Sequence, residues 1–149
     1  MGKKIYFAGP LFSEAEREFN QKLTNRLEAL GCQVFLPQRD GVKSNRPAFE
    51  AMNPDEQREA IFTLDRDKIL ESDIFLFILD GRVPDEGACV ELGIAYTHRY
   101  IGKANKLIVG LHTDMRAAFI NGKLNPMVRV PLDYVVSNQD ELIDLLNKA

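Results

Sequence analysis

The sequence predicts an α/β protein, a flavodoxin-like or Rossmann-like open sheet of about five parallel strands with helices on both faces. Short apolar runs alternate along the chain with amphipathic helical segments, which is the pattern of a parallel sheet. The run from Asp73 to Asp80 is apolar at every internal position, as expected of a central strand covered on both faces. With 149 residues, of which 45% are hydrophobic, the chain fits a single domain over residues 1–149.

The first elements are predicted from an apolar run and a helix start signal. Lys4 to Ala8 forms the first strand, which Gly9-Pro10 ends. Ser13 begins a helix because Glu16, three residues later, completes a capping box. Gly31 is placed to end that helix.

The next segment is expected to contain a strand, a long loop and a helix. Cys32 to Leu36 is the strand, and the polar stretch from Gln38 to Asn53 has no clear period. So long a loop in a small domain is often functional. Asn53 caps the following helix, which Pro54 opens and which runs to about Ser72.

The second half of the chain continues the alternation. After the central strand we expect a helix, a strand, an irregular segment with one short helix, a short strand and a closing helix. These elements are placed at 86–103, 106–111, 112–131 with the short helix at 115–120, 134–136 and 138–149. In such sheets ligands bind at the carboxyl ends of the strands, here the loops after Ala8, Leu36, Asp80 and Leu111.

Composition and missing motifs exclude several functions common in this fold. No GxGxxG follows the first strand, and neither GxxxxGK[ST] nor GxSxG occurs. The net charge of −3 argues against a nucleic-acid partner. Two histidines, and two cysteines without metal-type spacing, predict no metal site. With no signal peptide and no apolar run of membrane length, we expect a cytoplasmic protein without a membrane partner.

Glu91 is the first candidate for chemistry. It lies in the helix after the central strand, with Ala88 and Ala95 three residues before and four residues after it. Small neighbours leave room for a ligand to approach the carboxylate. Periodicity alone, however, favours a solvated glutamate on an exposed helix face.

Two further carboxylates have a plain and a functional interpretation. Asp65 falls on or beside the apolar stripe of its helix, at four residues from both Ile61 and Ile69. A proton donor with a raised pKa explains this position, and so does a buried hydrogen bond to a loop. Asp85 lies where a helix begins, where a carboxylate complements the helix dipole.

Aromatic and amide side chains complete the candidate set. Tyr6 is either a core tyrosine or a phenol that hydrogen-bonds a catalytic carboxylate. Gly9 and Pro10 make a tight turn before Phe12, which either staples the first helix or stacks on a planar ligand. The segment 125–127, with Asn125 and Met127, is either a surface loop or a loop that reaches into a site, including a neighbouring subunit's.

These residues resemble the nucleoside 2-deoxyribosyltransferase family over nearly the whole chain. The similarity lies in the segments 5–10, 72–74, 84–87, 91–93 and 125–127, together with Asp65 and Ala95. Its most specific part is the pattern Asp-x-Gly-x-x-x-Glu-Leu-Gly after a buried strand. The resemblance implies an enzyme that needs no metal or cofactor, is a homo-oligomer (dimer-based, up to a hexamer), and acts on 2′-deoxynucleosides and free purine or pyrimidine bases.

The resemblance also implies a role for each matching residue. Glu91 would attack C1′ of the deoxyribose and form a covalent intermediate, with Tyr6 positioning its carboxylate. Asp65 would handle the proton of the base, and Asp85 would hold the sugar hydroxyls. Asn125 would bind the 5′-hydroxyl in the adjoining subunit.

Around these residues the resemblance implies the rest of the binding site. Gly9, Phe12 and Met127 would contribute to substrate binding. Gln38 lies where the family contacts the base, at a place where the alignment fades. The chemistry agrees with the carboxylates themselves, because retaining glycosyl transfer uses one as nucleophile and a second group as acid and base.

Two other functions stay open. One is a hydrolase of deoxynucleosides or of their 5′-monophosphates. The related monophosphate hydrolases carry serines where this chain has Asp85 and Asn125, so these two residues favour transfer. The other is a non-catalytic nucleotide-binding module, which the fold alone allows.

Overall fold

The computed structural model describes residues 2–116 and 124–148. Five parallel strands form one sheet in the order β2-β1-β3-β4-β5. They are β1 (Lys4–Ala8), β2 (Gln33–Phe35), β3 (Ile74–Ile78), β4 (Leu107–Leu111) and β5 (Tyr134–Val136). This order is the flavodoxin-like one. The predicted fold class is therefore confirmed.

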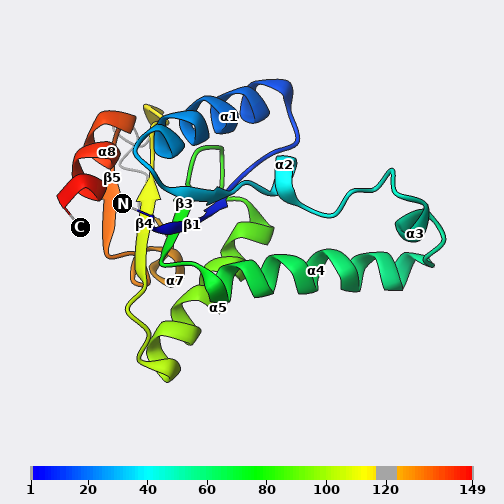
Figure 1. Cartoon of the computed structure of the whole chain (residues 1–149). Helices are drawn as coiled ribbons and strands as arrows, with labels where there is room; N and C mark the ends of the chain where they lie inside the picture. Colours follow the sequence, from blue (N-terminus) through cyan, green and yellow to red (C-terminus); the bar gives the residue numbers. More distant parts are fainter. Residues whose placement is uncertain (1, 117–123, 149) are drawn as a thin grey trace.

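Helices cover both faces of the sheet, as Figure 1 shows. On one face lie α1 (Glu14–Ala29) and α8 (Gln139–Lys148), and on the other lie α4 (Pro54–Glu71), α5 (Glu86–Gly102) and α7 (Pro126–Arg129). Side chains alternate along each strand, so the sheet separates two apolar cores. In β1, Ile5 and Phe7 face the first core, whereas Tyr6 and Ala8 face the second.

The helix starts read from the sequence are present. Ser13 and Glu16 form the capping box of α1. Asn53 caps α4 and forms a second capping box with Glu56. Asp85 caps α5, so this helix starts beside the carboxyl end of the central strand β3.

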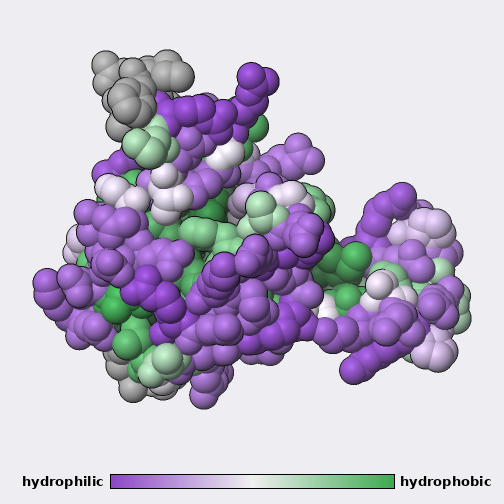
Figure 2. All heavy atoms as spheres, turned by 90° about the horizontal axis from the view of Figure 1, so that it is seen from above, coloured by the Kyte–Doolittle hydropathy of each residue, from purple (hydrophilic) through white to green (hydrophobic). Residues whose placement is uncertain are grey.

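The expected loop from Gln38 to Asn53 contains more structure than its lack of period indicated. Two single-turn helices, α2 (Pro37–Asp40) and α3 (Pro47–Glu50), lie within or at the edge of it. Each begins with a proline, whose fixed φ suits the first helical position. Together, α3 and the N-terminal half of α4 form an arm that projects from the body, and Figure 2 shows it as a largely hydrophilic lobe.

One predicted feature falls mainly outside the described ranges. The short helix at 115–120 is described only at its first two residues. Across residues 2–116 and 124–148, no helix combines the length and the apolar character that a membrane span requires.

Candidate active site

Tyr6 and Glu91 meet between the sheet and α5. The Tyr6 hydroxyl donates a hydrogen bond of 2.8 Å to Glu91 Oε1. The Tyr6 ring is fully buried and stacks on Phe35 and Phe75, with centroids 5.5 and 5.8 Å apart. The ring is thus held on both sides, and the position of its hydroxyl is fixed.

Glu91 is partly buried, which changes its acidity. Burial, together with the charges of Asp65 and Asp85, raises the pKa of Glu91 from 4.5 to about 7, although the hydrogen bond from Tyr6 acts in the opposite direction. Burial and the Glu91 charge raise the pKa of Tyr6 as well, so its hydroxyl stays a donor. The solvated glutamate that periodicity favoured is not what the structure contains.

Asp65 lies on α4, close enough to act electrostatically on both residues. Burial raises the pKa of Asp65 from 3.8 to about 6. No hydrogen bond within the described ranges contributes to that value. Two carboxyl groups with pKa values near neutrality therefore lie on neighbouring helices, an arrangement typical of acid–base and nucleophilic sites.

Asp85 has a structural role and also borders a cavity. Its Oδ2 accepts a hydrogen bond of 2.9 Å from the Ala88 N–H, which caps α5. It lines a cavity of about 340 Å³ between the β1–α1 and β3–α5 connections, together with Pro10, Phe12, Glu16, 80–84 and Glu86. These connections follow neighbouring strands at the point where the strand order reverses, the usual ligand position in this fold.

Phe12 borders the β1 side of this cavity, and Gly9 lies directly before another lining residue, Pro10. Gly9 has φ +151°, and a Cβ there would lie 2.8 Å from Ile78 Cβ, so only glycine lets the turn approach β3 so closely. Phe12 is 76% exposed. Its ring is therefore free to contact a ligand, although stacking on a base remains a prediction.

Gln38 lies on α2, and its amide is engaged within the protein. Its Oε1 accepts from Asn20 Nδ2 at 3.1 Å, and its Nε2 donates to the Arg17 carbonyl at 2.9 Å. Contact with the base remains a prediction. Asn20 was not predicted from the sequence as a site residue, although an asparagine three residues before Leu23, on the apolar stripe of α1, is a signal for a buried amide.

Asn125 and Met127 lie on α7. Asn125 caps this short helix by accepting from the Met127 N–H at 2.8 Å, and the Met127 side chain is 81% exposed. The structure describes one chain, so their contact with another subunit's substrate stays a prediction.

Asp80, two residues after the end of β3, was also not predicted from the sequence as a site residue. Its carboxylate accepts from the N–H and the hydroxyl of Thr113, at 2.6 and 2.5 Å, and from the Asp114 N–H at 2.9 Å. These bonds join the connection after β3 to the one after β4. Over the described ranges, no three His, Cys, Asp or Glu side chains lie close enough to hold a metal ion.

The chain is similar to one family and to solved structures across nearly its whole length. The family model "Nucleoside 2-deoxyribosyltransferase" matches residues 5–146. A conserved protein from Enterococcus faecalis V583 is 26% identical with a TM-score of 0.76, over 99% of both chains. The 2-deoxyribosyltransferase of Bacillus psychrosaccharolyticus is 24% identical with a TM-score of 0.73, over 93% of this chain and 89% of that one. Among curated protein sequences, none matches significantly.

Proposed function

The chain belongs to the nucleoside 2-deoxyribosyltransferase family, whose members are pentosyltransferase-type enzymes, and from this premise we propose that it exchanges the base of a 2′-deoxynucleoside by double displacement. The observation that carries the proposal is the Tyr6–Glu91 hydrogen bond, together with a partly buried Asp65 that acts electrostatically on both residues. It supplies a positioned nucleophile and a separate proton donor, the two groups that retaining glycosyl transfer needs.

In the first half-reaction, ionised Glu91 attacks C1′ of the deoxyribose. The bond from C1′ to the base nitrogen breaks, and the base takes its electron pair together with a proton from Asp65. The product is a deoxyribosyl ester of Glu91. In the second half-reaction a nitrogen of the incoming base attacks C1′, Asp65 accepts the proton of that base, and the Glu91 carboxylate leaves. This scheme calls for no metal or cofactor.

Electrostatics support this reaction and this class of substrate. The transition state has oxocarbenium character, so carboxylates near C1′ stabilise it. The cavity beside Asp85 is bordered by the further acidic residues Glu16, Asp80 and Glu86 and by a single basic one, Arg82. Such a surface accepts an uncharged nucleoside and repels a phosphate, which supports a nucleoside over a nucleotide. Base exchange of this kind serves nucleoside salvage.

The proposal includes a homo-oligomer. An apolar groove of about 600 Å³ runs between α4 and α5, lined by Phe62, Arg66, Leu70, Val90, 93–94, 97–98 and 101–102. Exposed apolar patches of this kind mark interaction sites. We assign the groove to a second copy of the chain, because Asn125 matches a residue that the family lends between subunits.

The test is an exchange assay with thymidine or deoxyinosine as donor and adenine as acceptor. We expect deoxyadenosine to form, and we expect Glu91→Gln to lose a factor on the order of 10³ or more, because glutamine accepts the Tyr6 hydrogen bond but cannot replace the nucleophile. Glu18→Gln, an exposed residue of α1 paired with Lys22, is the control and should match the wild type. If no pair of bases exchanges, the proposal is wrong. Faster release of base from a deoxynucleoside monophosphate than from the nucleoside would instead identify a hydrolase.

A further inference from the structure

We infer that Asn20 is a positioning residue, which fixes the Pro10–Phe12 wall of the cavity beside Asp85 and acts together with Gln38. The inference rests on the proposed function, because the wall is assigned to the nucleoside. It adds a residue that binds no substrate and that the family resemblance did not include.

Asn20 is a buried amide with two specific tasks. Its side chain is on α1, only 2% exposed, and a buried amide is costly unless it is hydrogen-bonded. The two hydrogens of one NH₂ group serve two other segments. Nδ2 donates to the Pro10 carbonyl at 2.9 Å and to Gln38 Oε1 at 3.1 Å. One side chain thus joins the connections after β1 and β2.

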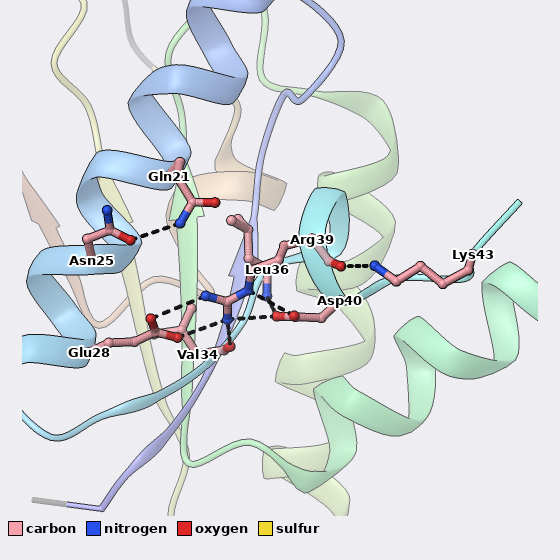
Figure 3. Close-up of polar contacts among 8 residues, drawn as sticks. All are labelled: Gln21, Asn25, Glu28, Val34, Leu36, Arg39, Asp40 and Lys43. Atoms are coloured by element: carbon pink, nitrogen blue, oxygen red, sulfur yellow. Dashed lines mark hydrogen bonds and ion pairs between the residues drawn. The ribbon is translucent and has the colours of Figure 1, made fainter. Parts of the chain in front are cut away.

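The Gln38 end of this tether is firmly anchored. Gln38 Nε2 donates back to the Arg17 carbonyl of α1. The next residue, Arg39, donates to both carboxylate oxygens of Glu28, to the Val34 carbonyl and to Asp40, as Figure 3 shows. Because α2 is held at several points, Asn20 ties the Pro10 carbonyl to a rigid base.

The Pro10 end of the tether controls the cavity wall. Pro10 and Phe12 both border the cavity that Asp85 lines. The Phe12 N–H donates to Glu16 at 2.9 Å, so the backbone is held on one side by Asn20 and on the other by the capping box. An exposed ring on a backbone fixed at two points is a preorganised contact surface, which favours binding by reducing the ordering cost.

The tether is separate from the reacting groups. Asn20 is on α1, which covers one face of the sheet, whereas Tyr6 and Glu91 meet on the face that α5 covers. Loss of the tether should therefore weaken substrate binding and leave the chemical step in place. This separation gives the inference a kinetic signature.

The experiment compares Asn20→Ala with Asn25→Ala. Asn25 is an exposed residue on the same helix, bonded only to Gln21 among the described residues, so the pair is matched in residue type and helix context (Figure 3). We expect Asn20→Ala to raise KM for the deoxynucleoside roughly tenfold, the usual scale for a lost buried hydrogen bond, with kcat within about twofold of wild type. Asn25→Ala should leave both constants unchanged.

A double-mutant cycle separates the tether from direct base contact by Gln38. If both residues act through one hydrogen bond, the KM of Asn20→Ala/Gln38→Ala should not exceed that of the worse single variant by more than about twofold. If the increases in KM of the two single variants instead multiply in the double variant, Gln38 contacts the base directly. This result would overturn the inference that Asn20 and Gln38 act together. If Asn20→Ala does not fold, Asn20→Ser, which keeps one donor, replaces it and should show a smaller rise in KM.

Amide hydrogen exchange tests whether the Asn20 tether exists, and this test does not depend on catalysis. Asn20→Ala should speed amide exchange in segments 11–13 and 38–41 and leave β1 and β3 unchanged. Unchanged exchange in those segments, or an unchanged KM in an active and folded variant, overturns the inference. A wild-type chain without any base exchange contradicts the proposed function instead, and the exchange rates of the two segments still decide whether the tether exists.

Discussion

At the residue scale, burial gives Glu91 its candidate role. A carboxylate on a helix surface is ionised throughout the neutral range, whereas burial raises the pKa of Glu91 to about 7. With the pKa of Asp65 raised to about 6, the two groups titrate as a coupled pair. The Tyr6 hydroxyl favours the charged form of Glu91, by its hydrogen bond to the carboxylate.

This coupling predicts the pH dependence of exchange. Since one carboxyl must be ionised and the other protonated, kcat/KM should be bell-shaped with limbs near pH 6 and 7. In Tyr6→Phe the pKa of Glu91 should rise by about one unit, because its carboxylate loses a stabilising donor. Glu91 has the higher pKa of the pair, so the limb near pH 7 should move upward by about one pH unit and the maximal kcat/KM should fall roughly tenfold. The retained ring keeps its stacking on Phe35 and Phe75. A pH profile of Tyr6→Phe that overlays the wild type would contradict this role.

The same burial predicts a cost in stability. The folded chain holds a proton on Glu91 between pH 4.5 and about 7, where the unfolded chain has released it, so the Glu91 contribution to stability falls as pH rises through this window. Glu91→Gln removes the titration. Between pH 4.5 and 8, its free energy of unfolding should gain at most about 3 kcal/mol on that of wild type, measured by urea unfolding. If the difference in free energy of unfolding between Glu91→Gln and wild type does not change with pH, the pKa of Glu91 is not raised by folding.

At the element scale, α2 is a single helical turn that Arg39 anchors to α1 and β2. The guanidinium forms ion pairs with Glu28 of α1 and with Asp40, and donates to the Val34 carbonyl of the β2 strand. Asp40 in turn accepts from the Leu36 N–H. A helix this short is not stable alone, so its stability depends on the ion pairs rather than on the helix propensity of its residues.

Arg39→Ala tests this arrangement. We expect a loss of about 1–2 kcal/mol in the free energy of unfolding, because the pairs are about one-third exposed and partly screened by solvent. Lys43→Ala is the control: that side chain is exposed, and its one side-chain hydrogen bond among the described residues is to the Arg39 carbonyl. Equal losses in the two variants, measured by urea unfolding, would contradict the anchoring role of Arg39.

At the scale of the whole molecule, the strand order creates the site and the outer helices leave an apolar surface. β1 and β3 are neighbours although α1, β2 and the helices α2 to α4 separate them in sequence, so the connections after these two strands meet around Asp85. On the outside, Phe62 of α4 and Ile101 of α5 border one groove and stay exposed in the single chain.

This surface predicts the effect of a charge on assembly. The wild type should have a mass that is a multiple of 16.9 kDa by light scattering, and Ile101→Glu should give single chains, because a buried unpaired carboxylate is costly. Exchange activity should fall with assembly if Asn125 serves a neighbouring subunit. Ala29→Glu, on the exposed face of α1, is the control. If the wild-type protein is a monomer, the groove does not bind a second copy of the chain and this assignment is wrong.

The sequence by itself determined the fold class, the helix starts at Ser13, Asn53 and Asp85, and the family to which the chain belongs. These features depend on periodicity, helix capping and the order of motifs, all of which can be read along the sequence without knowing how the elements pack. It also indicated Glu91 and Asp65 without deciding between a solvated and a buried carboxylate.

Only the tertiary structure decided how those carboxylates are surrounded. Tyr6 and Glu91 are 85 positions apart, and the packing of α5 on the sheet brings them together in a hydrogen bond. The environment of Gln38 depends in the same way on Asn20, which lies on a different element. Burial and long-range hydrogen bonds follow from how the elements pack, and no local pattern encodes them, which is why the acidity of the site and its internal tether appear only in the folded chain.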